Sequence, residues 1–539
     1  MKRCPVCSRA YADDTLRFCR HDGAPLASDE GDATRLFDSS QLGGGQTGSL
    51  PPDGAPARAA TSSSLTTPIA RRRGSRKTID SLAVLPLTNE SDDREADYLC
   101  DGITESIINS LSQLPRLRVV PRSTAFRYRG GEVDPQAVGR LLGVRAVLTG
   151  RVLQVGEWLI VKTELIDVEQ ESQLWGEQYR REWADILALE VEISRDISAE
   201  LRLKLTGEER RKLARRYTRN AEAYDAYLKG RHYVTSKRTE DWIRKGIESF
   251  QRAIDLDPNY ALAYAGLAEA YAFLASSTGG RPPRETYPKA KAAAERALAI
   301  DPALAEAHSS LGFSLLLYDW DFPAALREFK RAVKLNPSYA NAHDGLGFYY
   351  KATGRHDEAL VECEKSRRLE PLSPFPEVSL GWAHYFARRY ERAAEQGRKA
   401  LEMEPRLGFA HWIIGVACAL AGRHDEAVAA LKRAVEVSDG GLVFKAHLAY
   451  AHAVAGEGEA ARRILAELTD LARSRYVSAY YFAITHLGLG ETAPCLDALE
   501  STLEERSGFP AFLKVEPMFD PVRSEPRFAR LVERVGLEP

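Results

Sequence analysis

The chain has 539 residues, of which 44% are apolar and 28% charged, a balance typical of globular proteins large enough for several domains. Its 74 basic and 76 acidic residues leave a formal charge of -2, which excludes a general attraction to nucleic acid or to an anionic membrane surface. Nowhere do 18 consecutive apolar residues occur, and no apolar segment follows Lys2 and Arg3. We therefore expect no membrane span and no signal peptide, and we place the protein in the cytoplasm.

Three of the seven cysteines lie at the N-terminus, within the first 19 residues. Cys4 and Cys7 share one turn, and Cys19 follows with His21 and Asp22 close behind it. The pattern resembles a small zinc ribbon, in which one structural zinc ion takes four ligands. Three ligands are then Cys4, Cys7 and Cys19, and the fourth stays open: His21 is the better zinc ligand, whereas Asp22 stands where a ribbon has its last cysteine. The alternative is a redox pair or unrelated cysteines.

The composition changes after residue 28, where the ribbon-like segment (1–28) ends. Residues 29–77 are rich in Gly, Ser, Thr, Pro and Ala and finish in the basic run 71–77. Such a segment cannot bury enough apolar surface to offset the entropy of ordering, so we expect a disordered linker.

Residues 78–205 mix strand and helix patterns and predict an α+β domain. The expected elements are a strand at 82–87, a helix at 95–114, a strand at 117–121, a helix at 135–142, and two or three strands within 145–179. Alternating apolar residues from Leu159 to Leu165 indicate a half-buried strand. A long helix is expected from Ala184 to about Arg216, and residues 206–221 then connect to the next domain.

Several motifs of this domain, "LAVLPLTN", "LGVRAVLTGRV" and "LWGEQY", resemble the TolB amino-terminal type domain of bacterial multidomain regulators. In that family the domain continues into tetratricopeptide repeats, so the resemblance implies a role in bacterial signalling or regulation. Its polar run from Asp101 to Thr104 could touch a ligand, but we expect it to cap a helix or a turn.

From residue 222 the pattern is helical almost throughout, and prolines close successive helical pairs. They are Pro258, Pro302, Pro337, Pro371 and Pro405, at intervals of 44, 35, 34 and 34 residues. A period of 34 residues is that of tetratricopeptide repeats, which stack helical pairs into a superhelix with a concave binding face. We predict about seven repeats over 222–508 and a capping segment over 509–539. The fold class is thus multidomain: a small zinc ribbon, an α+β domain and an all-α superhelix.

The family register places aromatic residues on the concave face of the central repeats, at Phe348, Trp382, Tyr385, Phe409 and Trp412. Such a groove favours an apolar or extended segment of a protein or peptide partner. Alternatively these aromatics pack against neighbouring helices, or the C-terminal segment covers them.

No catalytic nucleophile, acid and base pair or phosphate-binding loop can be singled out. The glycines of 43–49 lack the lysine of a phosphate loop and lie in the linker. We therefore predict a protein without catalytic activity, a scaffold or adaptor. The alternative is a nucleic-acid-associated regulator that uses the ribbon and the basic residues of 71–77 and 210–219, although we expect both runs to be solvated charge. The sequence does not predict the oligomeric state.

Overall fold

The computed structural model describes three two-residue strands near the N-terminus and residues 79–91, 96–130, 134–236, 239–275 and 280–537. The chain divides into two compact units, Met1–Gly74 and Ser75–Pro539. In the part that is described, no helix is long and apolar enough to cross a membrane.

The described part of the first unit is a small antiparallel sheet in the order β2-β1-β3. Its strands are β1 (Lys2–Arg3), β2 (Ala10–Tyr11) and β3 (Ala27–Ser28). The five residues expected to hold zinc lie outside the described residues, namely Cys4, Cys7, Cys19, His21 and Asp22. The linker expected at 29–77 lies outside them as well.

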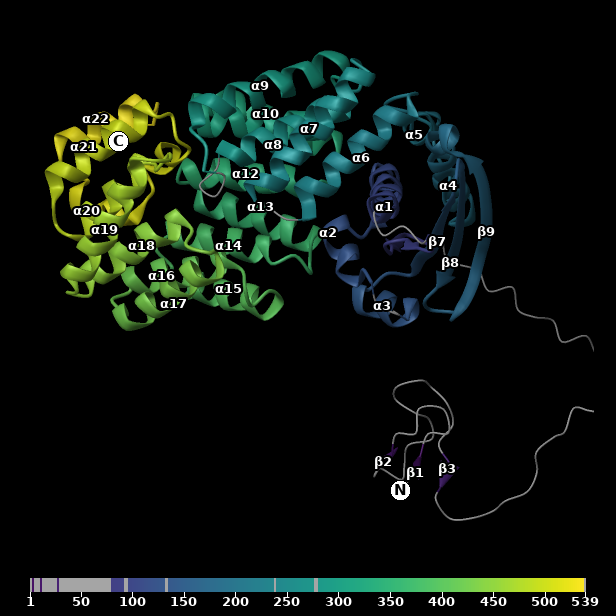
Figure 1. Ribbon diagram of the computed structural model, residues 1–539, viewed down its shortest axis with the longest axis horizontal. Coiled ribbons are helices and arrows are strands. Elements are labelled where there is room, and N and C mark those ends of the chain that lie inside the picture. The colour runs from purple at the N-terminus through teal and green to yellow at the C-terminus, as the bar shows by residue number, and fades with distance from the viewer. Residues whose placement is uncertain are drawn as a thin grey trace, which may run out of the picture. The chain divides into compact units, whose positions relative to one another are not determined.

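The second unit begins with an α+β domain built on one sheet, in the strand order β6-β4-β7-β8-β9, with β5 beside β7 (Figure 1). Its strands are β4 (Ser81–Val84), β5 (Thr88–Asn89), β6 (Arg118–Val119), β7 (Ala146–Val155), β8 (Trp158–Asp167) and β9 (Ser172–Glu182). β4 pairs in parallel with β6 and β7, whereas β7, β8 and β9 form an antiparallel meander. The alternation predicted for Leu159 to Leu165 is confirmed, because every second side chain of β8 is buried.

Helices pack against this sheet. They are α1 (Asp97–Ser112), α2 (Arg122–Ala125), α3 (Pro135–Leu142), α4 (Ile186–Glu200) and α5 (Gly207–Leu213). α1 packs on α4, and α3 packs on β7, where Gly139 allows close approach to the buried Val147. The α+β class of this region is thus confirmed.

The long helix expected from Ala184 to Arg216 is wrong. Two helices, α4 and α5, stand there, separated by an irregular stretch after Leu201. Arg202 adopts a left-handed backbone (φ 56°), and that conformation ends a helix. The polar run from Asp101 to Thr104 lies inside α1 and caps no helix end. Thr104 does satisfy a backbone donor before the helix, because its hydroxyl oxygen accepts a hydrogen bond from the N–H of Leu87 at 3.0 Å, and Asp101 pairs with Arg129 at 3.0 Å.

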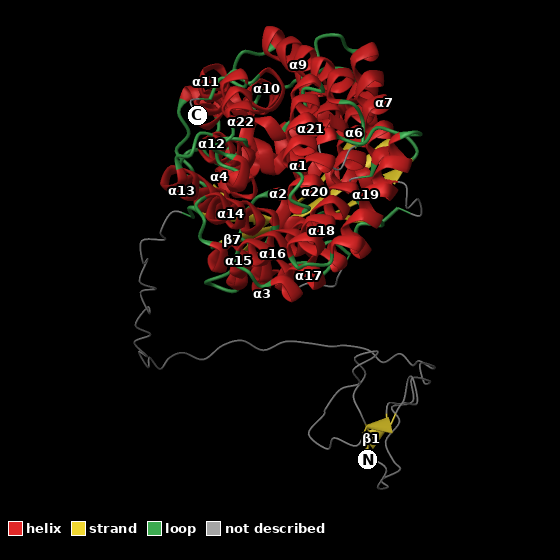
Figure 2. Cartoon of the chain, turned by 90° about the vertical axis from the view of Figure 1, so that its left-hand side faces the viewer, coloured by secondary structure: helices red, strands yellow, loops and turns green. Residues whose placement is uncertain are grey.

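The rest of the unit is a stack of helical pairs, shown in red in Figure 2. In the part of the chain that the structure describes, eight pairs follow one another: α6 (Ala221–Ser236) with α7 (Glu240–Leu256), α8 (Ala261–Ala275) with α9 (Pro283–Ile300), α10 (Ala305–Ser314) with α11 (Phe322–Leu335), α12 (Ala340–Ala352) with α13 (His356–Leu369), α14 (Phe375–Phe386) with α15 (Tyr390–Met403), α16 (Gly408–Leu420) with α17 (His424–Val437), α18 (Leu442–Val454) with α19 (Gly458–Ala472), and α20 (Ala479–Gly488) with α21 (Thr492–Glu504).

Each of the five prolines that mark the repeat period stands two residues beyond a helix end, as Pro337 does after α11. After three of these prolines, the Nε2 atom of a histidine six residues later lies 3.1 Å from the proline carbonyl oxygen: His308 with Pro302, His343 with Pro337, and His411 with Pro405. The extra residue of the 35-residue unit is absorbed by a π-helical turn at Leu315–Asp319. Three of the five turns therefore share one local contact between a histidine and a proline carbonyl.

The chain ends in a C-terminal segment that we define as residues 507–537. It contains two short 3-10 helices, Phe509–Phe512 and Pro517–Val522, and the helix α22 (Pro526–Arg534). Its apolar side chains belong to the same core as those of the central and C-terminal repeats. The segment is therefore an integral part of the superhelix.

Candidate binding sites on the concave face

The first helix of each pair contacts the first helix of the next, in the series α8, α10, α12, α14, α16, α18 and α20. These helices consequently form the inner side of the superhelix. Two separate cavities open on this side, an aromatic one toward its C-terminal end and a polar one beside the α+β domain.

The C-terminal segment covers part of the predicted aromatic groove. Phe512 lies parallel to Phe386 with 5.4 Å between ring centroids, and it also contacts Phe348 at 6.1 Å and Trp382 at 6.2 Å. The alternative in which this segment covers the aromatics therefore holds for Phe348 and Trp382.

Tyr385 lies deeper than the other predicted groove residues. Its side chain is 1% exposed, and its hydroxyl donates a hydrogen bond to the carboxyl group of Glu516, a residue of the C-terminal segment. Arg388 on the same repeat binds Asp520 at 2.7 Å. Both contacts hold the segment against the repeats.

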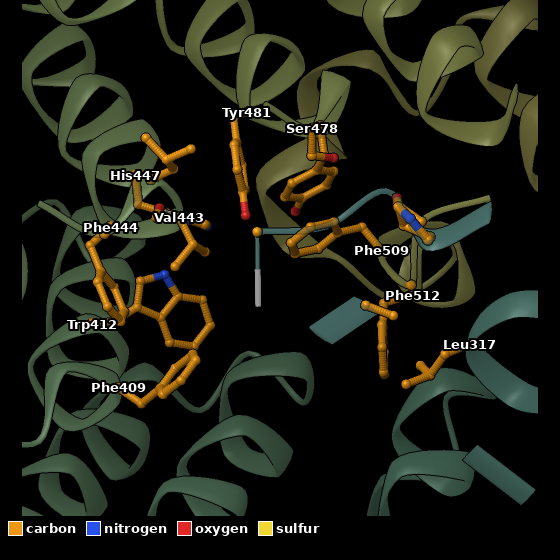
Figure 3. Close-up of a pocket in the computed structure, with 18 of the residues that line it drawn as sticks. Leu317, Phe409, Trp412, Val443, Phe444, His447, Ser478, Tyr481, Phe509 and Phe512 are labelled. Atoms are coloured by element: carbon orange, nitrogen blue, oxygen red, sulfur yellow. Dashed lines mark hydrogen bonds between the residues drawn. The ribbon is translucent and has the colours of Figure 1, made fainter. Parts of the chain in front are cut away.

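The aromatic cavity, which we call the chamber, has a volume of about 780 Å³. One wall carries Phe409 and Trp412 of α16 with Val443, Phe444 and His447 of α18 (Figure 3). The other wall carries Phe509 and Phe512, and Tyr481 of α20 points into the space between the walls. Phe348, Trp382, Phe409 and Trp412 all line the chamber, whereas Tyr385 does not.

The rings of the chamber hold one another largely by edge-to-face packing. Trp412 meets Trp382 at 5.4 Å and His447 at 5.2 Å, in both cases close to perpendicular. The indole N–H groups of both tryptophans are buried, with no hydrogen-bond partner among the described residues. Aromatic packing rather than hydrogen bonding therefore fixes this wall.

Burial shifts the pKa of two titratable groups of the chamber toward the neutral form. Burial lowers the pKa of His447 to about 4, and its Nδ1 lies 2.7 Å from the carbonyl oxygen of Val443. Burial raises the pKa of Glu516 to about 7, despite the hydrogen bond that it accepts from Tyr385. The apolar surroundings are the cause in both cases.

The second cavity, which we call the polar cleft, has a volume of about 910 Å³. One side consists of first helices, with residues three or four apart on each: Leu262, Ala265, Gly266 and Glu269 of α8, Glu306 and Ser310 of α10, and Asn341 and Asp344 of α12. The other side belongs to the α+β domain and α6, including Arg122, Phe126, Arg127 and Arg231. Arg127 bridges the two sides through hydrogen bonds to the carbonyl groups of Leu372 and Met403.

An ion-pair network at the base of the cleft joins the α+β domain to the repeats. Arg231 of α6 binds Glu105 of α1 at 2.7 Å and Glu269 of α8 at 2.8 Å, and Arg122 lies 2.8 Å from Glu105. Burial acts to raise the pKa of Glu105, but the two guanidinium groups outweigh it and lower the pKa. The cations among the cleft residues are thus largely engaged by this network.

Carboxylates outnumber cations around the cleft. Its acidic residues are Glu105, Glu269, Glu306, Asp344, Glu370 and Glu404, against three arginines. Burial raises the pKa of Glu306, although Arg231 acts in the opposite direction. This site was not predicted from the sequence, where only the aromatic residues of the concave face stood out, and scattered acidic residues such as Glu306 and Asp344 carry no comparable pattern.

In the part of the chain that the structure describes, no group of three or more His, Cys, Asp or Glu side chains is placed to hold a metal ion. The four cysteines described, Cys100, Cys363, Cys418 and Cys495, are all buried and unpaired.

Family models match two parts of the chain. Residues 77–193 match the second domain of HilA/YgeH-like transcriptional regulators. Residues 312–374 and 378–441 match the tetratricopeptide repeat, which confirms the repeat architecture. Repeats of this family commonly mediate interactions between proteins.

Among curated proteins, "Putative adenylate cyclase 3" of Rhizobium meliloti (strain 1021) is 34% identical over 238 residues, or 44% of this chain. The chain spans about 40% of that relative's length. Because the relative is named as an enzyme, the prediction of a protein without catalytic activity is contradicted, and we withdraw it.

Two solved structures are similar to parts of this chain. PilF of Pseudomonas aeruginosa is 17% identical, with a TM-score of 0.31, over 40% of this chain and 92% of that one. A tetratricopeptide repeat protein of Parabacteroides merdae is 13% identical, with a TM-score of 0.33, over 46% of this chain and 98% of that one.

Proposed function

We propose that this chain is a protein-binding adaptor of a bacterial signalling or regulatory system, and that it holds a basic segment of its partner in the polar cleft. The observation that carries this proposal is that three successive first helices turn their inner sides toward one open cleft of about 910 Å³. The names of the matched proteins, a transcriptional regulator and an adenylate cyclase, support a regulatory setting.

Charge selects the partner segment. Six carboxylates against three arginines leave the cleft residues acidic, although the whole chain is close to neutral. Lysine or arginine side chains of a partner would gain favourable interactions there, whereas acidic side chains would be repelled. The exposed Asn341 and the half-buried Ser310 leave room for side chains between the carboxylates.

A labelled deca-lysine peptide tests the cleft directly, with deca-glutamate as its counterpart. We expect deca-lysine alone to bind in fluorescence anisotropy, and to bind less tightly as salt rises. Asn341→Lys adds a positive charge inside the cleft and should weaken binding by about threefold or more at low salt, from an effect of about 0.5–1 kcal/mol per charge. Val361→Lys makes the same charge change at a side chain that is 54% exposed, outside the cleft residues.

Capture from the native host then identifies the partner. Crosslinked proteins should be recovered with the wild type and with Val361→Lys but be reduced with Asn341→Lys. Equal recovery with both variants would place the partner outside the polar cleft. The aromatic positions Phe409 and Trp412 would then be the first to test by substitution.

The activity named for the curated relative makes a second proposal, adenylate cyclase activity. It rests on the 34% identity over 238 residues. Incubating the full chain with ATP and Mn²⁺ and separating the products by chromatography tests it. Formation of cyclic AMP would support the enzyme. If no cyclic AMP forms while deca-lysine binds, the adaptor function is the one that remains supported.

We propose further that the N-terminal segment holds one structural zinc ion through Cys4, Cys7 and Cys19, with His21 or Asp22 as fourth ligand. The spacing of these residues supports this, as does the general ability of zinc to fold segments of this size. Atomic absorption should find one zinc per chain and none in Cys7→Ser. His21→Ala and Asp22→Ala separate the two candidates, since only the ligand's loss should weaken zinc retention against a chelator.

The finer identity of the α+β domain is also a proposal. Its motifs resemble the TolB amino-terminal type, whereas the family model that matches 77–193 is that of the HilA/YgeH-like second domain. Both assignments support a domain of regulatory proteins.

A further inference from the structure

The chamber is of a size suited to a small molecule. Its volume of about 780 Å³ lies within the range of roughly 300–1,000 Å³ that is usual for ligand pockets. Its walls are aromatic, and water in such a space finds few hydrogen-bond partners, so a ligand that displaces the water is favoured.

The walls limit what can enter. The C-terminal segment forms one of them, with Phe519, Phe528 and Leu531 each at most 1% exposed. Phe509 is stacked on Tyr480 at 4.0 Å and 3°. These contacts hold the wall in place beside Phe512, so the occupant must fit the existing space.

The lining also determines the ligand's charge. Neither His447 nor Glu516 offers a full charge at neutral pH in these surroundings, as described above. Arg475 is exposed, and Glu240 is bound by Arg281 at 2.6 Å. A charged ligand would lose its hydration and meet no buried counter-ion that is fully charged at neutral pH.

Among the residues that line the chamber, one buried hydroxyl group has no partner in the described part of the protein. Ser507 is 3% exposed and lines the chamber, and its Oγ has no hydrogen-bond partner among the described residues. A buried hydroxyl in this state is destabilising unless a ligand bonds to it. The hydroxyl group of Tyr287 lies near Ser507. It would be 3.8 Å from a Cβ atom placed on Gly508, the residue that follows Ser507.

We propose that the chamber binds a small uncharged amphiphile, whose aromatic or branched aliphatic body lies between Phe409 and Phe509 and whose polar group bonds to Ser507. A volume of about 780 Å³ accommodates on the order of 20 non-hydrogen atoms, at the roughly 30 Å³ that a water molecule occupies. This site is independent of the adaptor function proposed for the polar cleft.

Two probes with the same ring system test the charge requirement. N-phenyl-1-naphthylamine is uncharged and fluoresces in apolar surroundings, and 1-anilinonaphthalene-8-sulfonate adds a sulfonate. We expect the full wild-type chain to bind the uncharged probe saturably at one site and the sulfonate at least tenfold more weakly. Equal affinity for both probes, or no saturable binding of the uncharged one, overturns the proposal.

Matched variants locate the site. Leu317→Trp fills the chamber beside Phe512 and should weaken binding of the uncharged probe at least tenfold, whereas Leu141→Trp, at a side chain that is 72% exposed on α3, should not change it. Ser507→Ala should weaken binding about threefold or more without lowering the melting temperature, because no protein hydrogen bond from Oγ is lost.

Binding that both tryptophan variants leave unchanged places the probe outside the chamber and overturns the assignment. Loss of partner capture in Leu317→Trp with unchanged probe binding overturns it too, in favour of a peptide in the chamber. Failure of the deca-lysine experiment leaves this result untouched, since the polar cleft and the chamber share no lining residue.

Discussion

The C-terminal segment should behave as a fixed wall of the superhelix, and Phe519→Ala tests this. Phe519 is 0% exposed, with its ring centroid 6.0 Å from Tyr480 and 5.7 Å from Phe528. Truncating a fully buried phenylalanine removes its transfer free energy and leaves a cavity, at a cost of about 3–5 kcal/mol. Opening of the segment should become easier by up to this amount.

Amide hydrogen exchange measures that opening directly. Since each 1.4 kcal/mol is tenfold, amides of α22 (Pro526–Arg534) should exchange about 100- to 3,000-fold faster in Phe519→Ala when opening is in rapid equilibrium. Amides of α3 (Pro135–Leu142) in the α+β domain serve as an internal reference and should not change. Val361→Ala, at a side chain that is 54% exposed, is the control variant.

An α22 that exchanges at the same rate in wild type and Phe519→Ala would refute the reasoning, because its amides would then open without breaking the contacts of Phe519. Rapid exchange of α22 already in the wild type would show that the segment leaves the groove readily. Phe348 and Trp382 would then be open to a partner, as the sequence alone suggested.

Two further predictions concern buried groups away from the chamber. Burial raises the pKa of Glu190 to about 7, so the folded state keeps a proton that the unfolded chain loses near its ordinary value of 4.5. The contribution of Glu190 to the free energy of unfolding is fully present below pH 4.5 and falls by about 3 kcal/mol as the pH rises to 7. In urea unfolding, Glu190→Gln should lack this pH-dependent loss, whereas Glu200→Gln, at an exposed position, should retain it. Gly345→Ala puts a methyl group 2.3 Å from the fully buried ring of Phe329. It should lower the free energy of unfolding by about 1–3 kcal/mol, although alanine has the better helix propensity. Thermal unfolding should show a smaller loss when the same change is made in a Phe329→Leu background.

Local patterns predicted the repeats well because each repeat depends on contacts within about 34 residues. The prolines mark the helix ends, and after three of them a histidine six residues later contacts the proline carbonyl group, as His343 does with Pro337. The strand β8 was predictable for the same reason, since one buried face imposes alternation. The helix break at Arg202 was not, because a charged residue carries no local signal for a left-handed backbone.

The sequence by itself determined the helical period, the α+β character of residues 81–200 and which side of each repeat faces inward. Only the tertiary structure decided what covers that inner side. Tyr385 meets Glu516 across 131 residues, and Arg231 meets Glu105 across 126. Contacts at such separations depend on how the superhelix curves and on where the C-terminal segment returns, and a local periodicity specifies neither. The same curvature turned four predicted groove aromatics into the walls of a chamber and opened a polar cleft between Arg127 and Asn341.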